Sequence, residues 1–212
     1  MLNIADIRKD YKLQTLLGTD VAADPIVQFD KWWDDAVKSE ITEVNAMTLA
    51  TATADGIPAA RIVLLKGYDK SGFIFFTNYQ SHKGKEMEQN ANVCLVFFWK
   101  ELERQIRITG AVEKISAAES DAYFTSRPVG SRIGAWASPQ SAVIANRQVI
   151  ENSSKEFEQQ FAEGNIPRPP HWGGYIVKPV QMEFWQGRSS RLHDRIQYSL
   201  HNGSWSIERL AP

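Results

Sequence analysis

The chain has 212 residues, of which 43% are hydrophobic and 23% are charged, and its formal net charge is −1. This composition excludes a largely disordered chain and predicts a globular protein with one good core. The net charge excludes the long-range positive field of a general nucleic-acid binder, so any site for anions has to be small and local.

Two features indicate the compartment. The single cysteine, Cys94, lies in the apolar run 93–99, so a disulfide within the chain is excluded and a buried thiol in a reducing compartment is expected. No apolar stretch has the length of a signal-peptide core or of a membrane span. We therefore expect a cytoplasmic protein without membrane association.

The N-terminal part predicts an arm followed by a helix. Residues 1–23 are mixed polar and are expected to form a mobile arm or a short helix, and residues 24–212 are expected to form one domain. Asp24 followed by Pro25 is typical of a helix start, and an apolar stripe at helical spacing follows.

From Met47 the hydrophobic period becomes two. Residues 47–54 and 57–65 predict a hairpin around a turn at 55–56, and 73–78 would add a third strand to an antiparallel meander. Within the hairpin, the run 61–66 has four apolar residues between two cations, which predicts a buried strand. Its cations would either meet an anion or extend to water from the strand ends.

A polar helix is expected to begin near Ser81 and to end near Asn90. His82, Lys83 and Lys85 gather at its start, where free backbone N–H groups and the helix dipole favour an anion. The alternative is an ordinary solvated helix start. Both interpretations stay open from these residues alone.

The second half of the chain predicts strands with inserted helices. Ser116 and Glu119 form a capping box, which is typical of a helix start. The expected elements in order are strands 93–99 and 105–112, a helix 116–126, a loop 129–140, a helix 142–161, a linker 164–172, and strands 174–177, 181–185, 194–200 and 204–210 with a turn at 202–203. Six to nine short strands with added helices predict a mainly β (α+β) fold, a β-barrel with helical additions.

Several common chemistries have no motif in this sequence. Neither G-x-G-x-x-G nor G-x-x-x-x-G-K-[ST] occurs, and a G-x-S-x-G nucleophile elbow is missing. The four histidines show no metal-ligand spacing, so no metal is expected. Cationic groups on separate elements exceed what one phosphate needs, which favours two phosphorylated ligands: Arg61, Lys66, Lys83, Arg127 with Ser131, Arg188, Arg191 and Arg195.

Seven ordered motifs carry a resemblance to a known family. They are 61–66, 76–78, 103–105, 123–128, 133–136, 183–195 and 209–212. Together they closely resemble the pyridoxine (pyridoxamine) 5′-phosphate oxidases over nearly the whole chain. The resemblance implies an FMN-binding split β-barrel and a homodimer with active sites at its interface. The implied reaction oxidises pyridoxamine or pyridoxine 5′-phosphate to pyridoxal 5′-phosphate, with hydride passing to the flavin and O2 reoxidising it to give H2O2.

The same resemblance implies roles for individual residues. Catalysis would fall to Arg191 and His193, which would sit over the substrate ring. FMN would be bound by Arg61, Ile62, Val63, Leu64, Leu65, Lys66, Phe76, Thr77, His82, Lys83, Gln105, Gln140 and Ser141, with Trp185 and Arg195 coming from the partner chain. The substrate would be bound by Lys66, Tyr123, Arg127, Ser131, Arg191, Leu192 and His193, with Arg8 to Tyr11 as a lid.

The sequence departs from the family pattern at one position, and two other functions compete with the implied oxidase. His82 stands where the family commonly carries Arg, so a titratable group replaces a permanent cation and weaker FMN affinity is expected. Taken alone, Trp185 and His193 are more typical of a core than of a site. A different flavin-dependent split-barrel enzyme would have no reason to keep Arg191 and His193. Nor would a non-catalytic protein that binds FMN or pyridoxal phosphate.

Overall fold

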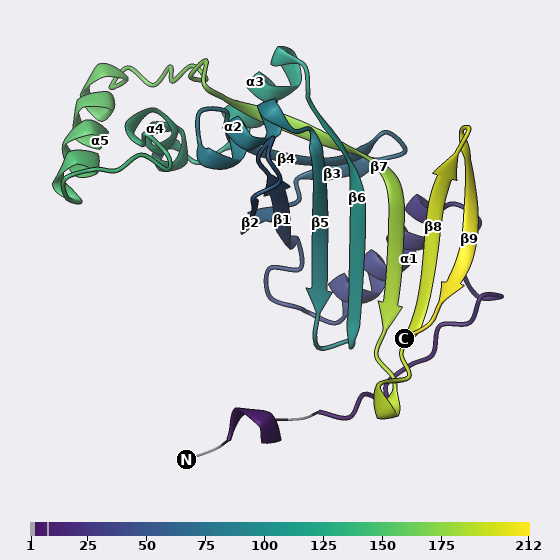
Figure 1. The fold of residues 1–212 in the computed structure, drawn as a ribbon. Helices are drawn as coiled ribbons and strands as arrows, with labels where there is room; N and C mark the ends of the chain where they lie inside the picture. Colours follow the sequence, from purple (N-terminus) through teal and green to yellow (C-terminus); the bar gives the residue numbers. More distant parts are fainter. Residues whose placement is uncertain (1–2, 8) are drawn as a thin grey trace. The chain divides into compact units, whose positions relative to one another are not determined.

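The computed structural model describes residues 3–7 and 9–212, and its elements are labelled in Figure 1. The helical segments are η1 (Ile4–Asp6), α1 (Pro25–Lys38), α2 (His82–Gln89), α3 (Ala117–Ser126), α4 (Val129–Ala137), α5 (Gln148–Gln160) and η2 (Ser189–Arg191), where η marks a 3-10 turn. The strands are β1 (Ala46–Ala52), β2 (Pro58–Leu64), β3 (Gly67–Asp69), β4 (Gly72–Asn78), β5 (Asn92–Trp99), β6 (Arg104–Lys114), β7 (Trp172–Gln186), β8 (Asp194–His201) and β9 (Ser204–Leu210). The predicted class, mainly β with helical additions, is confirmed.

The chain forms two compact units. Unit 1 comprises the residues up to Leu49 together with Cys94–Gly110 and Pro179–Pro212, and unit 2 comprises Ala50–Val93 and Ala111–Lys178. The units are described separately below. The division expected from the sequence, an arm over 1–23 and one domain over 24–212, stays a prediction.

The strands pair in the order β2-β1-β5-β6-β7-β4-β3, with β8 on β7 and β9 on β8. The predicted hairpin partners β1 and β2 are neighbours, but the predicted meander is wrong because β4 pairs with β3 and β7. Strand β7 is one long strand, where two short ones were expected. Its first half pairs with β4 and its second half with β8, so pairing on both halves keeps it extended.

Unit 1 packs α1 against aromatic side chains of the strands. Asp24 caps the helix by accepting the Ile26 N–H at 2.7 Å, which confirms the predicted start. Phe29 is fully buried and lies 5.5 Å from Phe97 between ring centroids, and Trp32 meets Phe184 edge-on at 5.2 Å. Burying such rings contributes about 1.5–3 kcal/mol each, so the apolar stripe is core.

In the same unit, β8 and β9 form the hairpin drawn in yellow in Figure 1. Asn202 and Gly203 at its tip have φ of 49° and 81°, which suits a tight two-residue turn. The predicted turn is therefore confirmed.

In unit 2, the predicted starts of two helices are confirmed. Ser81 caps α2 by accepting the Gly84 N–H, and Ser116 and Glu119 form the capping box that opens α3. Each cap satisfies backbone donors that a helix start leaves unpaired.

Two local predictions in unit 2 are wrong. The expected loop 129–140 contains helix α4, because Ile133 on this helix packs into a cluster with Phe124, Ile166 and Trp172 that local periodicity does not reveal. Helix α5 begins at Gln148 and not near residue 142, and the preceding segment is exposed.

The expectation of buried strands also needs correction. Strand β2 ends the sheet order, and Ile62 on it is 64% exposed, so the run 61–66 is not buried as a whole. Leu65 is buried, whereas Lys66 lies exposed after the strand. Cys94 is half-buried, not buried, because alternate residues of β5 face opposite sides.

Among the helices of residues 3–7 and 9–212, none combines the length and the apolar character that crossing a membrane requires.

Candidate functional site

Unit 2 contains a cavity of about 820 Å³. It brings together most of the predicted FMN and substrate residues from strands β2 and β4 and helices α2 to α4. Its lining is Arg61, Ile62, Val63, Leu64, Lys66, Phe76, Thr77, Asn78, Lys83, Tyr123, Arg127, Pro128, Ser131, Gly134, Ala135, Ser138, Gln140 and Trp172.

One end of this cavity is formed by the start of α2. Lys83 is buried there, and its Nζ lies 3.5 Å from Ser81 Oγ. Burial and the neighbouring Arg61 lower the pKa of the Lys83 ammonium. Among residues 3–7 and 9–212 no carboxylate forms an ion pair with it. A buried cation without an ion pair favours an anionic ligand at this end.

Arg61, at the same end, has a partner within the protein. Its Nη2 lies 3.0 Å from Glu86 Oε2, and Thr51 hydrogen-bonds to both side chains. The hydrogen bond from the Thr51 hydroxyl and the Arg61 guanidinium lower the pKa of Glu86. Burial raises this pKa, but its effect is smaller than that of Thr51. Of the two possibilities left open for the run 61–66, Arg61 therefore meets an anion, and Lys66 reaches solvent.

Arg127 forms another cationic wall of the cavity. It ends α3, next to Pro128, and its guanidinium lies 4.6 Å above the Trp172 ring. Its Nη1 is buried and has no hydrogen-bond partner within residues 3–7 and 9–212, and burial lowers the pKa of the guanidinium. An unpaired buried donor of this kind fits a phosphate oxygen. Tyr123 beside it stacks on Phe76 at 3.9 Å between centroids.

A second cavity in unit 2, of about 580 Å³, contains two further predicted residues of that unit, His82 and Ser141. His82, Gln140 and Ser141 line it, and Gln140 and Asn78 line both cavities. Thr77 Oγ1 donates to Gln140 Oε1 at 3.4 Å, which fixes the amide at the boundary.

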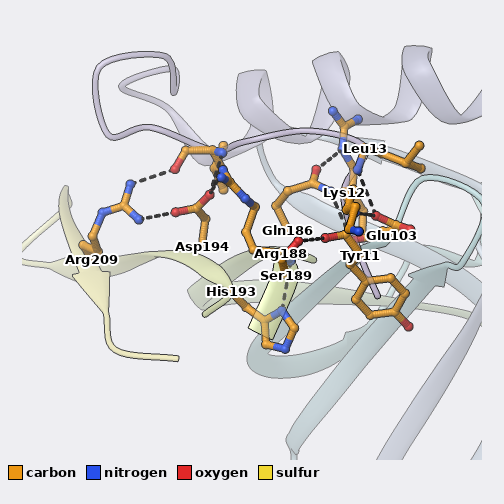
Figure 2. Close-up of polar contacts among 12 residues, drawn as sticks. Tyr11, Lys12, Leu13, Glu103, Gln186, Arg188, Ser189, His193, Asp194 and Arg209 are labelled. Carbon is orange, nitrogen blue, oxygen red and sulfur yellow. Dashed lines mark hydrogen bonds and ion pairs between the residues drawn. The ribbon is translucent and has the colours of Figure 1, made fainter. Parts of the chain in front are cut away.

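The predicted catalytic pair lies in unit 1, on the loop between β7 and β8. Figure 2 shows His193 on this loop, beside Tyr11. His193 Nδ1 accepts the backbone N–H of Arg188 at 3.1 Å, and its ring lies 4.5 Å from Trp185. Burial and the neighbouring Arg191 lower the pKa of the imidazole. Arg191 itself is exposed.

Ion pairs fix the strand residues that flank this loop. Asp194 lies 3.1 Å from Arg188 Nη1 and 2.8 Å from Arg209 Nη1. Arg195 donates to Glu183 at 2.7 Å, and Glu183 also pairs with Arg107. The Glu183 carboxylate raises the pKa of Arg195.

The structure therefore separates the predicted residues into two sets. One set lines the cavities of unit 2, with Leu65 buried outside their linings. The other set belongs to unit 1: Tyr11, Gln105, Trp185, Arg191, Leu192, His193 and Arg195. Arg8 lies outside the described residues. The individual roles stay predictions.

The sequence prediction missed several residues of the cavity. Asn78, Ser138 and Trp172 line it, and Glu86 and Thr51 bind Arg61. Asn78 lies in the motif 76–78, which gave a signal. The partners of Arg61 come from β1 and α2 and gave none, because they approach it only through tertiary packing.

No group of three His, Cys, Asp or Glu residues is placed to hold a metal ion within the described ranges.

Comparisons with known families match nearly the whole chain. The sequence model of a family described as pyridoxamine 5′-phosphate oxidase matches residues 33–161. A second, described as the pyridoxine 5′-phosphate oxidase C-terminal dimerisation region, matches residues 172–212.

Curated relatives have similar length and high identity. The pyridoxine/pyridoxamine 5′-phosphate oxidase of Cupriavidus metallidurans is 58% identical over 100% of both chains. The protein of the same name from Nostoc punctiforme is 57% identical over 99% of this chain and 98% of its own.

Solved structures show the fold. PhzG from Burkholderia lata, in complex with tetrahydrophenazine-1-carboxylic acid, has a TM-score of 0.89 at 30% identity, covering 94% of this chain and 99% of PhzG. A pyridoxamine 5′-phosphate oxidase-related, FMN binding protein from Nostoc punctiforme has a TM-score of 0.71 at 19% identity, covering 91% of this chain and 100% of that one. The second likeness concerns the fold alone, and the predicted split β-barrel is confirmed.

Proposed function

The chain is an oxidoreductase that belongs to the pyridoxamine 5′-phosphate oxidase family, and on this premise we propose that it converts pyridoxamine and pyridoxine 5′-phosphate to pyridoxal 5′-phosphate. FMN is the proposed cofactor and O2 the final acceptor. The observation that carries the proposal is the cavity of about 820 Å³, with the buried Lys83 on one wall and the half-buried Arg127 on another.

The residues present fit FMN at the α2 end of the cavity. Lys83 is buried and forms no ion pair within the described part of the chain, and Arg61 is held beside it by Glu86. Together with the free N–H groups of the helix start they would bind the FMN phosphate. Thr77 and Gln140 would contact the remainder of the cofactor. When bound, FMN supplies an acceptor for the hydride that leaves the substrate, and its reoxidation by O2 yields H2O2.

The other cationic wall fits the substrate phosphate. Arg127 Nη1 is a buried donor with no partner in the described ranges, and Lys66, Tyr123 and Ser131 line the same cavity. Fixing the phosphate there would orient the substrate, which is the main contribution a protein makes when a cofactor supplies the chemistry.

Arg191 and His193 are proposed to act at the reacting carbon. Because His193 Nδ1 accepts the Arg188 N–H, the neutral ring carries its proton on Nε2. Nε2 is therefore the atom through which this side chain would steer the proton that leaves the amine or alcohol. The exposed Arg191 guanidinium would orient the substrate and stabilise developing charge.

A homodimer is part of the proposal. The match of residues 172–212 to a dimerisation region supports it. In this arrangement Trp185 and Arg195 would reach the flavin from the partner chain.

The test is spectroscopic. We would add pyridoxamine 5′-phosphate without oxygen to the purified protein and follow the flavin absorbance near about 450 nm. Bleaching that air reverses, with pyridoxal 5′-phosphate as product, is the expected result. A yellow protein that does not bleach would point to another flavoprotein function. A colourless protein that FMN cannot reconstitute would exclude the FMN assignment itself.

A further inference from the structure

The loop that carries Arg191 and His193 has a backbone that needs support from outside. Ser190 and Arg191 have φ of 57° and 63°, in the left-handed region that residues other than glycine rarely adopt. Two such residues in succession persist only where the surrounding structure fixes them. The neighbours of this loop therefore determine where His193 lies.

Glu103 supports the start of this loop through its backbone. Its carbonyl oxygen accepts the Gly187 N–H at 2.7 Å and Gln186 Nε2 at 3.2 Å. Glu103 itself is 2% exposed and has a φ of 55°, so it is held in place in the turn before β6. Glu103 is part of the motif 103–105, but the proposed reaction assigns no role to it.

The Glu103 side chain binds a second segment, the residues that follow Tyr11. Its Oε2 accepts the backbone N–H groups of Lys12 at 2.9 Å and Leu13 at 3.1 Å. Its Oε1 lies 3.4 Å from Nζ of Lys9, whose side chain is 64% exposed. An exposed ion pair contributes little, so the two backbone donors are the main partners of this buried carboxylate.

Tyr11 connects the two parts that Glu103 holds. Its ring lies 5.9 Å from Trp185 and 6.2 Å from His193, and its carbonyl accepts Ser189 Oγ at 3.2 Å. The ring covers Gly187 so closely that an added Cβ would lie 2.6 Å from Tyr11 Cδ2. Figure 2 shows Glu103, Tyr11 and His193 within this one network.

We propose that Glu103 is a positioning residue for His193: it holds Gly187 through its carbonyl and Lys12 and Leu13 through its carboxylate, and so keeps Tyr11 against the His193 loop. The consequence for catalysis rests on the proposed function. The effect on the His193 ring does not.

The test is nitrogen NMR of the histidine rings in the full chain without ligand. Glu103→Ala removes the acceptor, whereas Glu103→Gln keeps a carbonyl oxygen for the two N–H groups. In the wild type and in Glu103→Gln, His193 should be the Nε2–H tautomer and titrate below about pH 6.5. In Glu103→Ala we expect mixed tautomers and a titration that moves up toward the ordinary value.

The structure identifies the groups that face the His193 ring. Arg191 is the charged neighbour on the loop, the Arg188 N–H donates to Nδ1, and the Tyr11 and Trp185 rings flank the imidazole. The Glu103 variants substitute none of these residues. Glu101→Ala, an exposed carboxylate in the same turn, is the matched control and should leave the His193 spectrum unchanged.

Steady-state kinetics then relate the ring to turnover. Glu103→Ala should lower kcat by roughly 10- to 100-fold with unchanged FMN affinity, and Glu103→Gln should restore most of it. A wild-type His193 tautomer and titration in folded Glu103→Ala would overturn the proposal. If the NMR spectra differ as expected but neither the wild type nor any variant has oxidase activity, the proposed function is contradicted instead.

Gly187→Ala keeps the proposal testable should Glu103→Ala fail to fold. The added methyl group displaces Tyr11 and leaves Glu103 intact, so the same change in the His193 spectrum is expected. Gly130→Ala, where an added Cβ has no neighbour within 4 Å, is its control. An unchanged His193 spectrum in Gly187→Ala would contradict the positioning role.

Discussion

The cavity of unit 2 and the region of the His193 loop in unit 1 differ in whether their charged side chains are paired. In the cavity, among the residues that the structure describes, Arg127 has a buried donor without a partner and Lys83 is buried without an ion pair. Beside the loop, Asp194 forms ion pairs with both Arg188 and Arg209. Under the proposed function the first arrangement is completed by an anionic ligand, whereas the second pairs its charges within the chain.

This difference predicts different consequences of mutation. A buried cation without a counterion destabilises the folded chain, so its removal should weaken ligand binding without loss of stability. A carboxylate that accepts hydrogen bonds from several donors stabilises the fold, so its removal should mainly lower the free energy of unfolding. The predictions below test this contrast, from the largest expected effect to the smallest.

Arg127→Met should have the largest effect, on substrate binding. A charge-assisted hydrogen bond to phosphate contributes about 1.5–3 kcal/mol, so KM for pyridoxamine 5′-phosphate should rise by about 10- to 150-fold. FMN affinity and thermal stability should not fall. Steady-state kinetics and a melting curve measure both, with the exposed Arg147→Met as control. An unchanged KM would remove Arg127 from the substrate site.

Lys83→Met should separate cofactor binding from stability. We expect the dissociation constant of FMN to rise by about tenfold or more, because one buried cation near the phosphate is lost. The protein without cofactor should melt at the same or a higher temperature, since burial already disfavours the Lys83 charge. Flavin titration and calorimetry measure the two quantities, with the exposed Lys155→Met as control. A less stable apoprotein would contradict the contrast.

Asp194→Asn should show the opposite behaviour. Burial alone would raise the pKa of this carboxyl, but the Leu16 N–H and Arg209 outweigh it and lower the pKa below 3.8. The charged form therefore stabilises the fold above that pH, and the contribution is lost as the pH falls through the folded-state pKa. The variant should lose about 1–3 kcal/mol near neutral pH, and less in acid.

Urea unfolding at several pH values measures this loss. Glu113→Gln, which breaks an exposed pair with Lys178, serves as the control and should change stability far less. A pH-independent loss in Asp194→Asn would show that its charge is not what stabilises the loop.

His82→Arg should have the smallest effect. It replaces a titratable group in the second cavity with a permanent cation, so FMN affinity should rise by about two- to fivefold. Fluorescence titration of FMN measures the gain, and equal affinities of the wild type and the variant would exclude a role for His82 at the phosphate.

Local chemistry made three helix starts and one hairpin turn predictable. Asp24, Ser81 and Ser116 cap their helices through their own side chains, and Asn202 and Gly203 adopt the positive φ that their residue types favour. These features depend on neighbours within a few residues, so the sequence contains them.

Long-range packing explains the predictions that failed. Helix α4 depends on Ile133 meeting Phe124 and Trp172, which are distant along the chain. Strand β7 is continuous because β4 and β8 pair with its two halves. The exposed Ile62 on β2 shows the same limit, because an apolar run does not specify whether another layer covers it.

The sequence by itself determined the family motifs, the residue types able to bind two phosphates, and the caps that begin the helices. Only the tertiary structure decided which cations are paired, because Glu86 reaches Arg61 from another element while Arg127 Nη1 meets no acceptor among the described residues. It likewise placed the Glu103 carboxylate on the Lys12 and Leu13 N–H groups, 91 and 90 residues away along the chain. Pairing of charges is a property of distances in space, and the spacing of residues along a chain does not contain it.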